Sequence, residues 1–512
     1  MATAEPKPSW AVPHHGLATV SVMAATIMQA IDSTIANVAL PRMQGTLSAT
    51  QDQISWVLTS YIVAVAITIP LTGWLAGRFG RKRVFLLSVA GFTIASALCG
   101  MAENLSQIVL FRLLQGVCGA ALVPLSQAVL FDINPPWRYG RAMAVWGVGV
   151  TMGPIIGPAL GGWLTQSYNW RWVFFINVPI GILALLGLSY AMPETKRHGH
   201  RFDFFGFVTL SLALGSLQMM LDRGELKDWF GSPEIIAEAA VMVVAFYLFV
   251  VHTATHKRPF LNPALFSDRN FATSNVFIFI VGVVLFATLA LIPPMLQHEM
   301  GYPVFTTGLV TAPRGAGSMM AMMIVGRLVG IIDARLLAAA GMGLTAFSLW
   351  QMTHFSLQMS EWPVVISGLL QGFGVGLCYV PLTTIAFTTL PSALRNEGTA
   401  FFNLLRNIGS SIGISCVQTL LTRNTQTMHA SIGAHITPYA AQSGVYAASG
   451  IDPASPTGLA LLNRMINNQA AMVAYIDDFK LMMICTLAVI PLLLLIRGAR
   501  KTAGAEPGLV MD

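Results

Sequence analysis

The sequence is poor in charge. Asp, Glu, Lys and Arg make up only 10% of its 512 residues, whereas a soluble protein carries about 25%. Hydrophobic residues make up 55%, and the mean hydropathy is +0.66. This composition excludes an ordinary soluble enzyme and predicts a chain that crosses a membrane many times.

Other features are scarce or missing. The five cysteines are scattered in apolar stretches, so we expect neither a disulfide framework nor a metal site. The polar opening MATAEPKPSWAVPHHG lacks the apolar core of a signal peptide. No phosphate-binding loop of the ATPase kind is present, so we expect no cofactor and no use of ATP. The net charge of +7 comes from basic residues in short loops, which predicts membrane topology rather than nucleic-acid binding.

Fourteen apolar stretches come close to the ~20 residues that a bilayer helix needs. They are 17–40, 54–77, 84–102, 106–131, 141–164, 172–192, 204–221, 233–252, 271–296, 306–326, 336–354, 362–390, 398–421 and 471–496. Nineteen of the 29 Lys and Arg residues fall in the tails and alternate loops of one face, and seven fall on the other. We therefore predict an all-α membrane protein with both tails, 1–16 and 497–512, in the cytoplasm.

The chain repeats itself at an interval of about 256 residues. Gln115-Gly116 recurs as Gln371-Gly372, Gly153 and Gly157 recur as Gly409 and Gly413, and Gly73-Trp-Leu-Ala-Gly77 recurs loosely from Gly326. These matches predict two six-helix halves, 17–192 and 271–496, separated by an inserted hairpin and its linkers, 193–270. Duplicated helical halves are typical of secondary transporters with a central site. The segment 422–470 is the longest piece expected outside the membrane, on the face away from the cytoplasm.

Asp32 lies near the middle of the first apolar stretch. A carboxylate at the centre of a bilayer helix costs roughly 2.5–3.5 kcal/mol on insertion scales. We find no other acid deep in any predicted span, and the position about 255 residues later is near Ala287. Helix capping or simple packing is an alternative role, although the middle of a span is the wrong place for a cap. The residue is our first candidate for a functional site.

Arg112 is a basic residue inside the fourth span, and the matching place in span twelve has no basic residue. A purely structural cation, bonded to helix carbonyls, is one interpretation. The other is that its charge tunes Asp32: burial favours the neutral carboxyl and a nearby cation favours the carboxylate. These opposing effects predict a group that titrates near physiological pH.

The fifth span carries glycine at every fourth position, at Gly149, Gly153, Gly157 and Gly161, with Pro154 and Pro158 between them. Such a stripe lets another helix approach closely. Tight packing would account for the glycines but not for the prolines, which remove backbone donors and bend a helix. We expect a conformational role between helices.

Several stretches resemble a known family. Gly153-x-x-x-Gly157-Pro158-x-x-Gly161-Gly162 resembles the antiporter motif of drug exporters in the major facilitator superfamily. Gly73-Trp-Leu-Ala-Gly77-Arg78-Phe79-Gly80-Arg81 resembles the superfamily's loop motif between spans two and three, and Leu110–Gly116 its span-four motif. The stretches 30–41, 172–181, 221–230 and 381–384 are similar to the fourteen-helix drug:proton antiporters, the EmrB branch in particular. The likeness covers nearly the whole chain.

The resemblance implies a major facilitator fold in a bacterial inner membrane and a proton gradient as the energy source. It also implies an EmrA-type periplasmic adaptor and a TolC-type outer-membrane channel as partners, for which the segment 422–470 is our candidate dock. The loop motif usually has an acid where this chain has Gly77, an acid that helps to lock the cytoplasmic side. Arg78 and Arg81 remain, and Asp132 at the end of span four is a possible partner for one of them.

Polar residues inside other spans are candidates for lining a substrate cavity. Arg314 and Arg406 are buried cations, for which an anion-attracting role, pairing with Asp32 in one conformational state and structural pairing are all open. The full candidate set is Gln29, Asn37, Gln115, Gln127, Arg314, Gln371, Asn403, Arg406 and Asn407.

The pattern predicts a proton-coupled antiporter that exports small hydrophobic or amphipathic compounds from the cytoplasm or the inner lipid leaflet. An exporter of one endogenous metabolite, such as a fatty acid or a siderophore, fits the same residues. A proton-gated channel or sensor is a third interpretation, although the duplicated halves argue against it. A membrane enzyme is disfavoured because no nucleophile, base or metal set converges.

Overall fold

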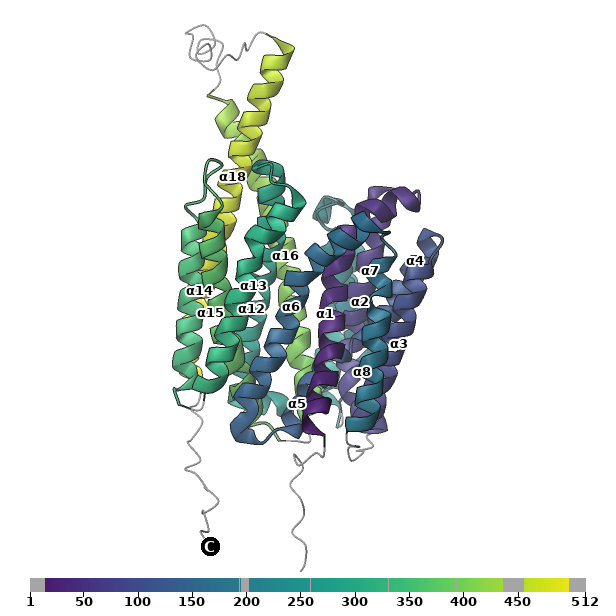
Figure 1. Cartoon of the computed structure of the whole chain (residues 1–512). Helices are drawn as coiled ribbons and strands as arrows, with labels where there is room; N and C mark the ends of the chain where they lie inside the picture. Colours follow the sequence, from purple (N-terminus) through teal and green to yellow (C-terminus); the bar gives the residue numbers. More distant parts are fainter. Residues whose placement is uncertain are drawn as a thin grey trace, which may run out of the picture.

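The chain folds into two helical bundles that stand side by side (Figure 1). The computed structural model describes residues 14–192, 194, 202–257, 259–329, 331–391, 394–435 and 455–496, and these residues form helices and no strand. Helices α1 to α4 and α8 lie in one bundle, α12 to α15 and α18 lie in the other, and α6 and α16 run between them.

The N-terminal bundle holds the first six predicted spans. Its helices are α1 (His15–Thr46), α2 (Gln51–Phe79), α3 (Arg81–Met101), α4 (Leu105–Gly119), α5 (Leu122–Ile133), the 3-10 turn η1 (Pro136–Arg138), α6 (Tyr139–Ser167), α7 (Trp172–Phe175) and α8 (Asn177–Ala191). Two predicted spans are interrupted, 106–131 between α4 and α5 and 172–192 between α7 and α8. Proline explains both interruptions, because Pro124 and Pro179 offer no N–H to the carbonyls four residues earlier.

The inserted hairpin consists of α9 (Phe204–Arg223) and α10 (Pro233–Thr255), joined through the 3-10 turn η2 (Trp229–Gly231) and followed by the short α11 (Ala264–Ser267). Helix α9 packs against α2 and α16, whereas α10 packs mainly on α9 and is largely exposed. Asp203 caps α9 through Gly206 N–H and also accepts a hydrogen bond of 2.9 Å from His252 of α10. The carboxylate therefore ties together the open end of the hairpin.

The C-terminal bundle holds the last six predicted spans. Its elements are α12 (Arg269–Pro294), the π turn η3 (Met295–Glu299), α13 (Val304–Leu328), α14 (Ala334–Met352), α15 (Trp362–Thr388), α16 (Arg395–Gly433), α18 (Pro456–Val489) and the 3-10 turn η6 (Ile490–Leu495). The π turn follows Pro293 and Pro294, which break the hydrogen-bond ladder at the end of α12.

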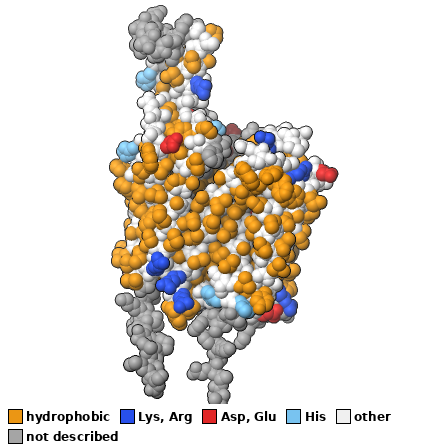
Figure 2. Space-filling model, in the orientation of Figure 1, with side chains coloured by type: hydrophobic (Ala, Val, Ile, Leu, Met, Phe, Trp, Pro, Cys, Tyr) orange, Lys and Arg blue, Asp and Glu red, His pale blue; other side chains and the backbone are white. Residues whose placement is uncertain are grey.

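Each predicted apolar stretch coincides with helix. Eleven helices of the described chain are long and apolar enough to cross a membrane; the other three, α13, α14 and α16, lie where spans were predicted but are less apolar overall. Figure 2 shows hydrophobic side chains across the middle of the visible face, with Lys and Arg side chains mostly toward its two ends. This distribution is that of a multi-pass membrane protein.

Glycines that match in the sequence repeat make matching contacts. A Cβ added to Gly116 of α4 would lie 2.6 Å from Tyr61 O of α2, and one added to its counterpart Gly372 of α15 would lie 1.8 Å from Arg314 O of α13. Similarly, Gly153 of α6 packs on α1, and its counterpart Gly409 of α16 packs on α12. Each pair of helices can approach this closely only because the position has no side chain.

Helices α16 and α18 continue past the bundle and form a protruding hairpin at the top of Figure 1, which we call the stalk. Its described part comprises residues 422–435 and 455–470, and His429 and Asn463 join the two helices through a hydrogen bond of 2.8 Å. The sequence predicts 422–470 as the longest segment outside the membrane; residues 422–433 and 456–470 are helical, and residues 436–454 lie outside the described part. We call the opposite end of the molecule, where α5 ends and α16 begins, the Asp132 end.

Candidate functional site

Asp32 is fully buried in α1 and holds three hydrogen bonds. Its Oδ2 accepts from Arg112 Nη1 at 2.8 Å, and its Oδ1 accepts from Gln115 Nε2 and from Asn177 Nδ2, each at 2.8 Å. The donors come from α4 and α8, so one carboxylate joins three helices of the N-terminal bundle. A buried carboxylate is stable in such a place only with partners of this kind.

Arg112 is 1% exposed and has further partners besides Asp32. Its Nε donates to Val57 O at 3.2 Å, and its Nη1 also donates to Gln115 Oε1 at 2.8 Å. The guanidinium carbon lies 4.2 Å from the centre of the Tyr61 ring, at cation–π distance. The arginine is thus bonded to one helix carbonyl and to the acid at once.

Asn177 is the member of this cluster that sequence reasoning missed. It is fully buried at the first residue of α8 and also donates to Ser96 Oγ at 3.0 Å. The interruption of the span before Pro179 places this residue at the helix start. An amide inside the apolar stretch 172–192 was the available signal.

The C-terminal half contains an uncharged counterpart of this cluster. At the 256-residue interval Asp32 corresponds to Thr288, Gln115 to Gln371 and Arg112 to Gly368. Gln371 Nε2 donates to Thr288 Oγ1 at 3.1 Å, just as Gln115 donates to Asp32. The hydrogen-bonding position is kept in both halves, whereas the ion pair occurs in the first alone.

The glycine stripe of α6 lies against the part of α1 that carries Asp32. A Cβ at Gly153 would lie 2.3 Å from Ala30 O, and one at Gly157 would lie 2.2 Å from Thr34 Oγ1. Thr34 Oγ1 donates in turn to Gly153 O at 3.0 Å. Gly149 and Gly161 make similar close approaches to Met23 and Ile35. A shift of α1 therefore cannot occur without a response in α6.

The second face of α6 contacts the other half of the molecule. Gly140 and Gly147 lie against Val329 and Met322 at the α13 side. Gly162 has only a loose neighbour, Val38 at 4.0 Å, while Pro158 lines the cavity described below; the side chain of Pro154 lies outside the described part. Helix α6 thus touches the Asp32 helix on one side and the C-terminal half on the other.

A cavity of about 680 Å³ lies between the two halves, within the usual size range of ligand pockets. Six of the nine residues expected to line it do so: Gln29, Asn37, Arg314, Asn403, Arg406 and Asn407.

Gln115, Gln127 and Gln371 do not line the cavity, which corrects the sequence prediction. All three are fully buried between helices, where their amides join neighbouring spans. Gln127 of α5 accepts from Asn403 Nδ2 of α16 at 2.9 Å, a bond that links the two halves. A polar side chain in an apolar span is satisfied as well by another helix as by a cavity, so the sequence could not separate the two cases.

Sequence reasoning also missed the contribution of the inserted hairpin. Leu217, Gln218, Leu221 and Asp222 of α9 line one side of the cavity. Gln218 Oε1 accepts a hydrogen bond of 2.8 Å from Ser411 of α16. The hairpin is therefore part of the cavity wall.

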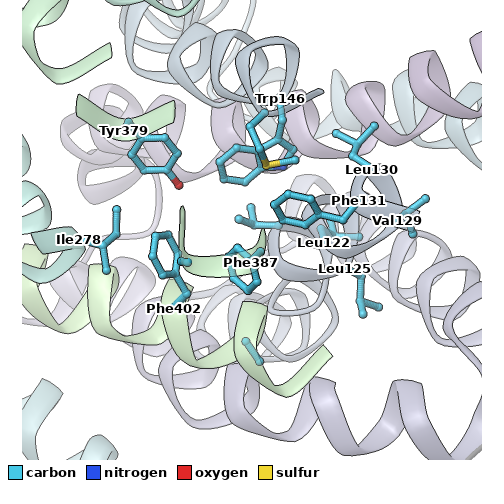
Figure 3. Close-up of a cluster of buried hydrophobic side chains, with 14 of the residues drawn as sticks. Leu122, Leu125, Val129, Leu130, Phe131, Trp146, Ile278, Tyr379, Phe387 and Phe402 are labelled. Carbon is cyan, nitrogen blue, oxygen red and sulfur yellow. The ribbon is translucent and has the colours of Figure 1, made fainter. Parts of the chain in front are cut away.

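At the Asp132 end the cavity stops at packed aromatic rings, which we call the aromatic plug (Figure 3). Trp146 and Tyr379 stack with ring centres 5.9 Å apart, and beyond them Phe131 lies 5.0 Å from Phe387, which lies 5.5 Å from Phe402. Trp146 and Phe131 come from the N-terminal half and the other rings from the C-terminal half. The plug joins the halves and separates the cavity from the Asp132 end.

Charged groups lie beyond the plug. Asp132 forms an ion pair with Arg81, and its other oxygen lies 3.5 Å from Arg395 Nη1 of α16. Gly73 packs against the start of α16, where an added Cβ would lie 3.0 Å from Glu397 Cα. Gly77 is partly buried and Arg78 is exposed on the same helix. Through Arg395, Asp132 thus connects the two halves, although position 77 carries glycine in place of the usual acid.

Comparison with known proteins agrees with this architecture. The Major Facilitator Superfamily domain matches residues 22–414. The chain is 36% identical to the fatty acid resistance protein FarB of Neisseria gonorrhoeae, covering 95% of this chain and 97% of that protein. It is 38% identical to the multidrug export protein EmrB of Escherichia coli K12, covering 82% and 83% respectively.

The fold agrees with that of solved transporters. The proton:xylose symporter XylE superimposes with a TM-score of 0.57 over 92% of this chain and 96% of that one, at 12% identity. The chain therefore belongs to the Major Facilitator Superfamily and is a multi-pass membrane transporter.

Proposed function

We propose that this protein is a proton-coupled antiporter that exports hydrophobic and amphipathic toxic compounds across a bacterial inner membrane. The observation that carries the proposal is the Asp32 cluster: one buried carboxylate, held by Arg112, next to the wall of a central cavity, with an uncharged counterpart in the second half. Relatives named for multidrug export and for fatty acid resistance support this substrate range.

In this mechanism Asp32 carries the proton. Protonation removes the carboxylate charge that Arg112 faces, so the ion pair that joins α1 to α4 weakens. Asp32 itself does not line the cavity, but Gln29, Ser33 and Thr34 on the same helix do. A change in α1 reaches α6 through the glycine contacts, and α6 reaches the C-terminal half. Protonation is thereby linked to the relative position of the halves.

In this proposal the Asp132 end lies in the cytoplasm, as the loop charges predict. The closed Asp132 end then corresponds to the outward-facing stage of the cycle. Opening inward then requires the aromatic plug to separate and Asp132 to release Arg395. Substrate enters from the cytoplasm or the inner leaflet in that stage. A continuous pore is disfavoured by the plug, which argues against a channel.

The test is substrate-driven pH change in proteoliposomes. Wild-type protein should move protons against substrate, and Asp32→Asn should bind substrate but move none. Asp477→Asn is the matched control, because Asp477 is an exposed acid of α18 outside the cluster. Proton-coupled export that survives in Asp32→Asn would refute the assignment of Asp32.

We further propose that the stalk is the docking site of an EmrA-type periplasmic adaptor, which connects to a TolC-type outer-membrane channel. Leu461 and Met465, one helical turn apart on α18, are 51% and 54% exposed, which supports contact with a partner protein. Changing both to serine should reduce export by whole cells but leave transport in proteoliposomes unchanged. Equal loss in both assays would indicate misfolding and would contradict the docking role.

A further inference from the structure

The inserted hairpin occupies one side of the cavity, between a helix of each half. Helices α2 and α16 touch directly at the Asp132 end, where a Cβ added to Gly73 would lie 3.0 Å from Glu397 Cα. Helix α9 packs against both of them. Toward the stalk it adds to the cavity wall the residues Leu214, Leu217, Gln218, Leu221 and Asp222. Helix α9 therefore completes the wall between α2 and α16.

Two hydrogen bonds between side chains tie α9 to the helices on either side. Asp222 Oδ2 accepts from Thr59 Oγ1 of α2, in the N-terminal half. Gln218 Oε1 accepts from Ser411 Oγ of α16, in the C-terminal half, at 2.8 Å. The two acceptors are four residues apart on α9 and so lie on the same side of that helix. One short stretch of the hairpin thus holds both halves at once.

These two bonds lie far from the direct contact between α2 and α16. Fourteen residues separate Thr59 from Gly73, and fourteen separate Ser411 from Glu397, which is about 21 Å of helix in each case. When the halves of a transporter rock about a central site, the two ends of the molecule move in opposite senses. The distance between Thr59 and Ser411 therefore changes when the Asp132 end opens, and α9 cannot keep both bonds.

The contacts of the hairpin with the N-terminal half run along most of α2. Near the Asp132 end, the ring centres of Phe202 and Trp74 lie 4.6 Å apart. At the stalk side, the guanidinium carbon of Arg223 lies 5.1 Å from the centre of the Trp56 ring. Eighteen residues separate Trp56 from Trp74, or about 27 Å of helix. The hairpin is thus fixed to α2 at both ends.

The middle of α9 is also closely packed on α2. A Cβ added to Gly215 would lie 3.2 Å from Ile67 Cδ1, so the two helices approach closely there. By contrast, the bond between Gln218 and Ser411 is the one side-chain hydrogen bond that joins α9 or α10 to the C-terminal half within the described chain. The attachment to the N-terminal half is extended, whereas the polar attachment to the C-terminal half is a single bond.

We propose that the inserted hairpin is a moving side wall of the cavity. It travels with the N-terminal half, and the bond between Gln218 and Ser411 forms when the Asp132 end is closed and breaks when that end opens. The bond to α2 persists in both states. The hairpin separates the cavity from lipid, since α9 lines the cavity and α10 exposes apolar residues such as Phe246 and Val250. The inference concerns the motion of the chain and depends on neither the substrate nor proton coupling.

The experiment measures distances between pairs of spin labels by double electron–electron resonance, on the full chain in phosphatidylcholine nanodiscs. The five native cysteines are first replaced by alanine. Cysteines for labelling are then introduced, two at a time, at one exposed residue of each part on the stalk side. These are Glu103 after α3 in the N-terminal half, Leu226 at the tip of the hairpin and Ser356 after α14 in the C-terminal half.

Two variants populate the state in which the Asp132 end is open. Asp132→Asn removes the carboxylate that Arg395 faces, and Phe387→Ala weakens the aromatic plug. In each of them the distances from Ser356 to Glu103 and from Ser356 to Leu226 should both change. The distance from Glu103 to Leu226 should stay as it is in wild type.

Two outcomes of these measurements would overturn the proposal. If the distance from Glu103 to Leu226 changes together with the others, the hairpin does not travel with the N-terminal half. If the distance from Glu103 to Ser356 is unchanged in both variants, the halves do not separate and no bond to α16 needs to break.

A matched pair of substitutions tests the two bonds themselves, in the Asp132→Asn background. Ser411→Ala removes a bond of the closed state alone, so the ratio of closed to open molecules should fall about fivefold, the equivalent of one ordinary hydrogen bond. Thr59→Val removes a bond that both states keep, so the ratio should not change. Equal shifts in the two variants, or no shift in Ser411→Ala, would contradict the assignment. The proposed export function is tested separately by pH change in proteoliposomes, and its failure would leave these distances unaffected.

Discussion

The ion pair between Asp32 and Arg112 makes a quantitative prediction about stability. The two side chains are 0% and 1% exposed, so neither can be solvated when the other is neutralised. Removing one partner of a buried pair costs about 3–5 kcal/mol. Asp32→Asn keeps the shape of the side chain, yet it leaves the charge of Arg112 facing no anion, with Val57 O, Gln115 Oε1 and the rings of Tyr61 and Phe174 as its neighbours. We expect a loss in this range.

Arg112→Gln should cost less than Asp32→Asn, because the carboxylate keeps the amide donors of Gln115 and Asn177. The double variant removes both charges, so its loss should be smaller than the sum of the single losses. We expect an interaction free energy of about 3 kcal/mol, the upper end for residues in contact. The measurement is unfolding by SDS titration in mixed micelles, followed by tryptophan fluorescence. Additive single losses would refute the view that the pair is a coupled, fully buried unit.

Three further predictions follow from packing and from charge. Gly153→Val should strongly reduce transport while leaving the protein in the membrane, because its side chain would overlap Ala30 O and force α1 away from α6; near-normal transport in proteoliposomes would contradict the coupling of these helices. Phe387→Ala should weaken the aromatic plug, and a cysteine placed at Phe131 in that background should react faster with a thiol reagent applied from the Asp132 end. Burial raises the pKa of the Asp203 carboxyl, but hydrogen bonds from Gly206, His252 and Phe260 hold it below its usual value overall; the stabilisation is therefore present above the unfolded pKa of about 3.9 and lost as the pH falls through the lower folded value, so wild type but not Asp203→Asn should lose thermal stability across this acid range.

Much of the fold could be predicted from the sequence because the signals are long. Each apolar stretch coincides with helix, since a lipid-exposed backbone has no alternative way to satisfy its polar groups. The interruptions between α4 and α5 and between α7 and α8 were not predicted, because other helices of this chain continue across a proline, as α2 does at Pro70 and α15 does at Pro381. Such breaks depend on what the neighbouring helices offer to the freed carbonyls.

The candidate site was only partly accessible to sequence reasoning. Asp32 and Arg112 stand out because a charge in an apolar span is costly wherever it points. Gln127 and Gln371 are polar but not charged, and an amide can face a cavity or another helix at similar cost. Asn177 and Gln218 were missed because an uncharged amide in an apolar span does not show from the sequence which group it contacts. Their roles depend on contacts between elements far apart in the chain, which no local pattern records.

Helix α16 has a mechanical consequence. It is one helix of 39 residues, from Arg395 beside Asp132, past Arg406 at the cavity, to Gly433 in the stalk, a rod of about 58 Å. A tilt of the C-terminal half by ~10° would swing the far end of such a rod by ~10 Å. Release of a few contacts beside Asp132 would thus be amplified into a large displacement at the opposite end of the molecule. A partner protein bound to the stalk would be displaced in each transport cycle.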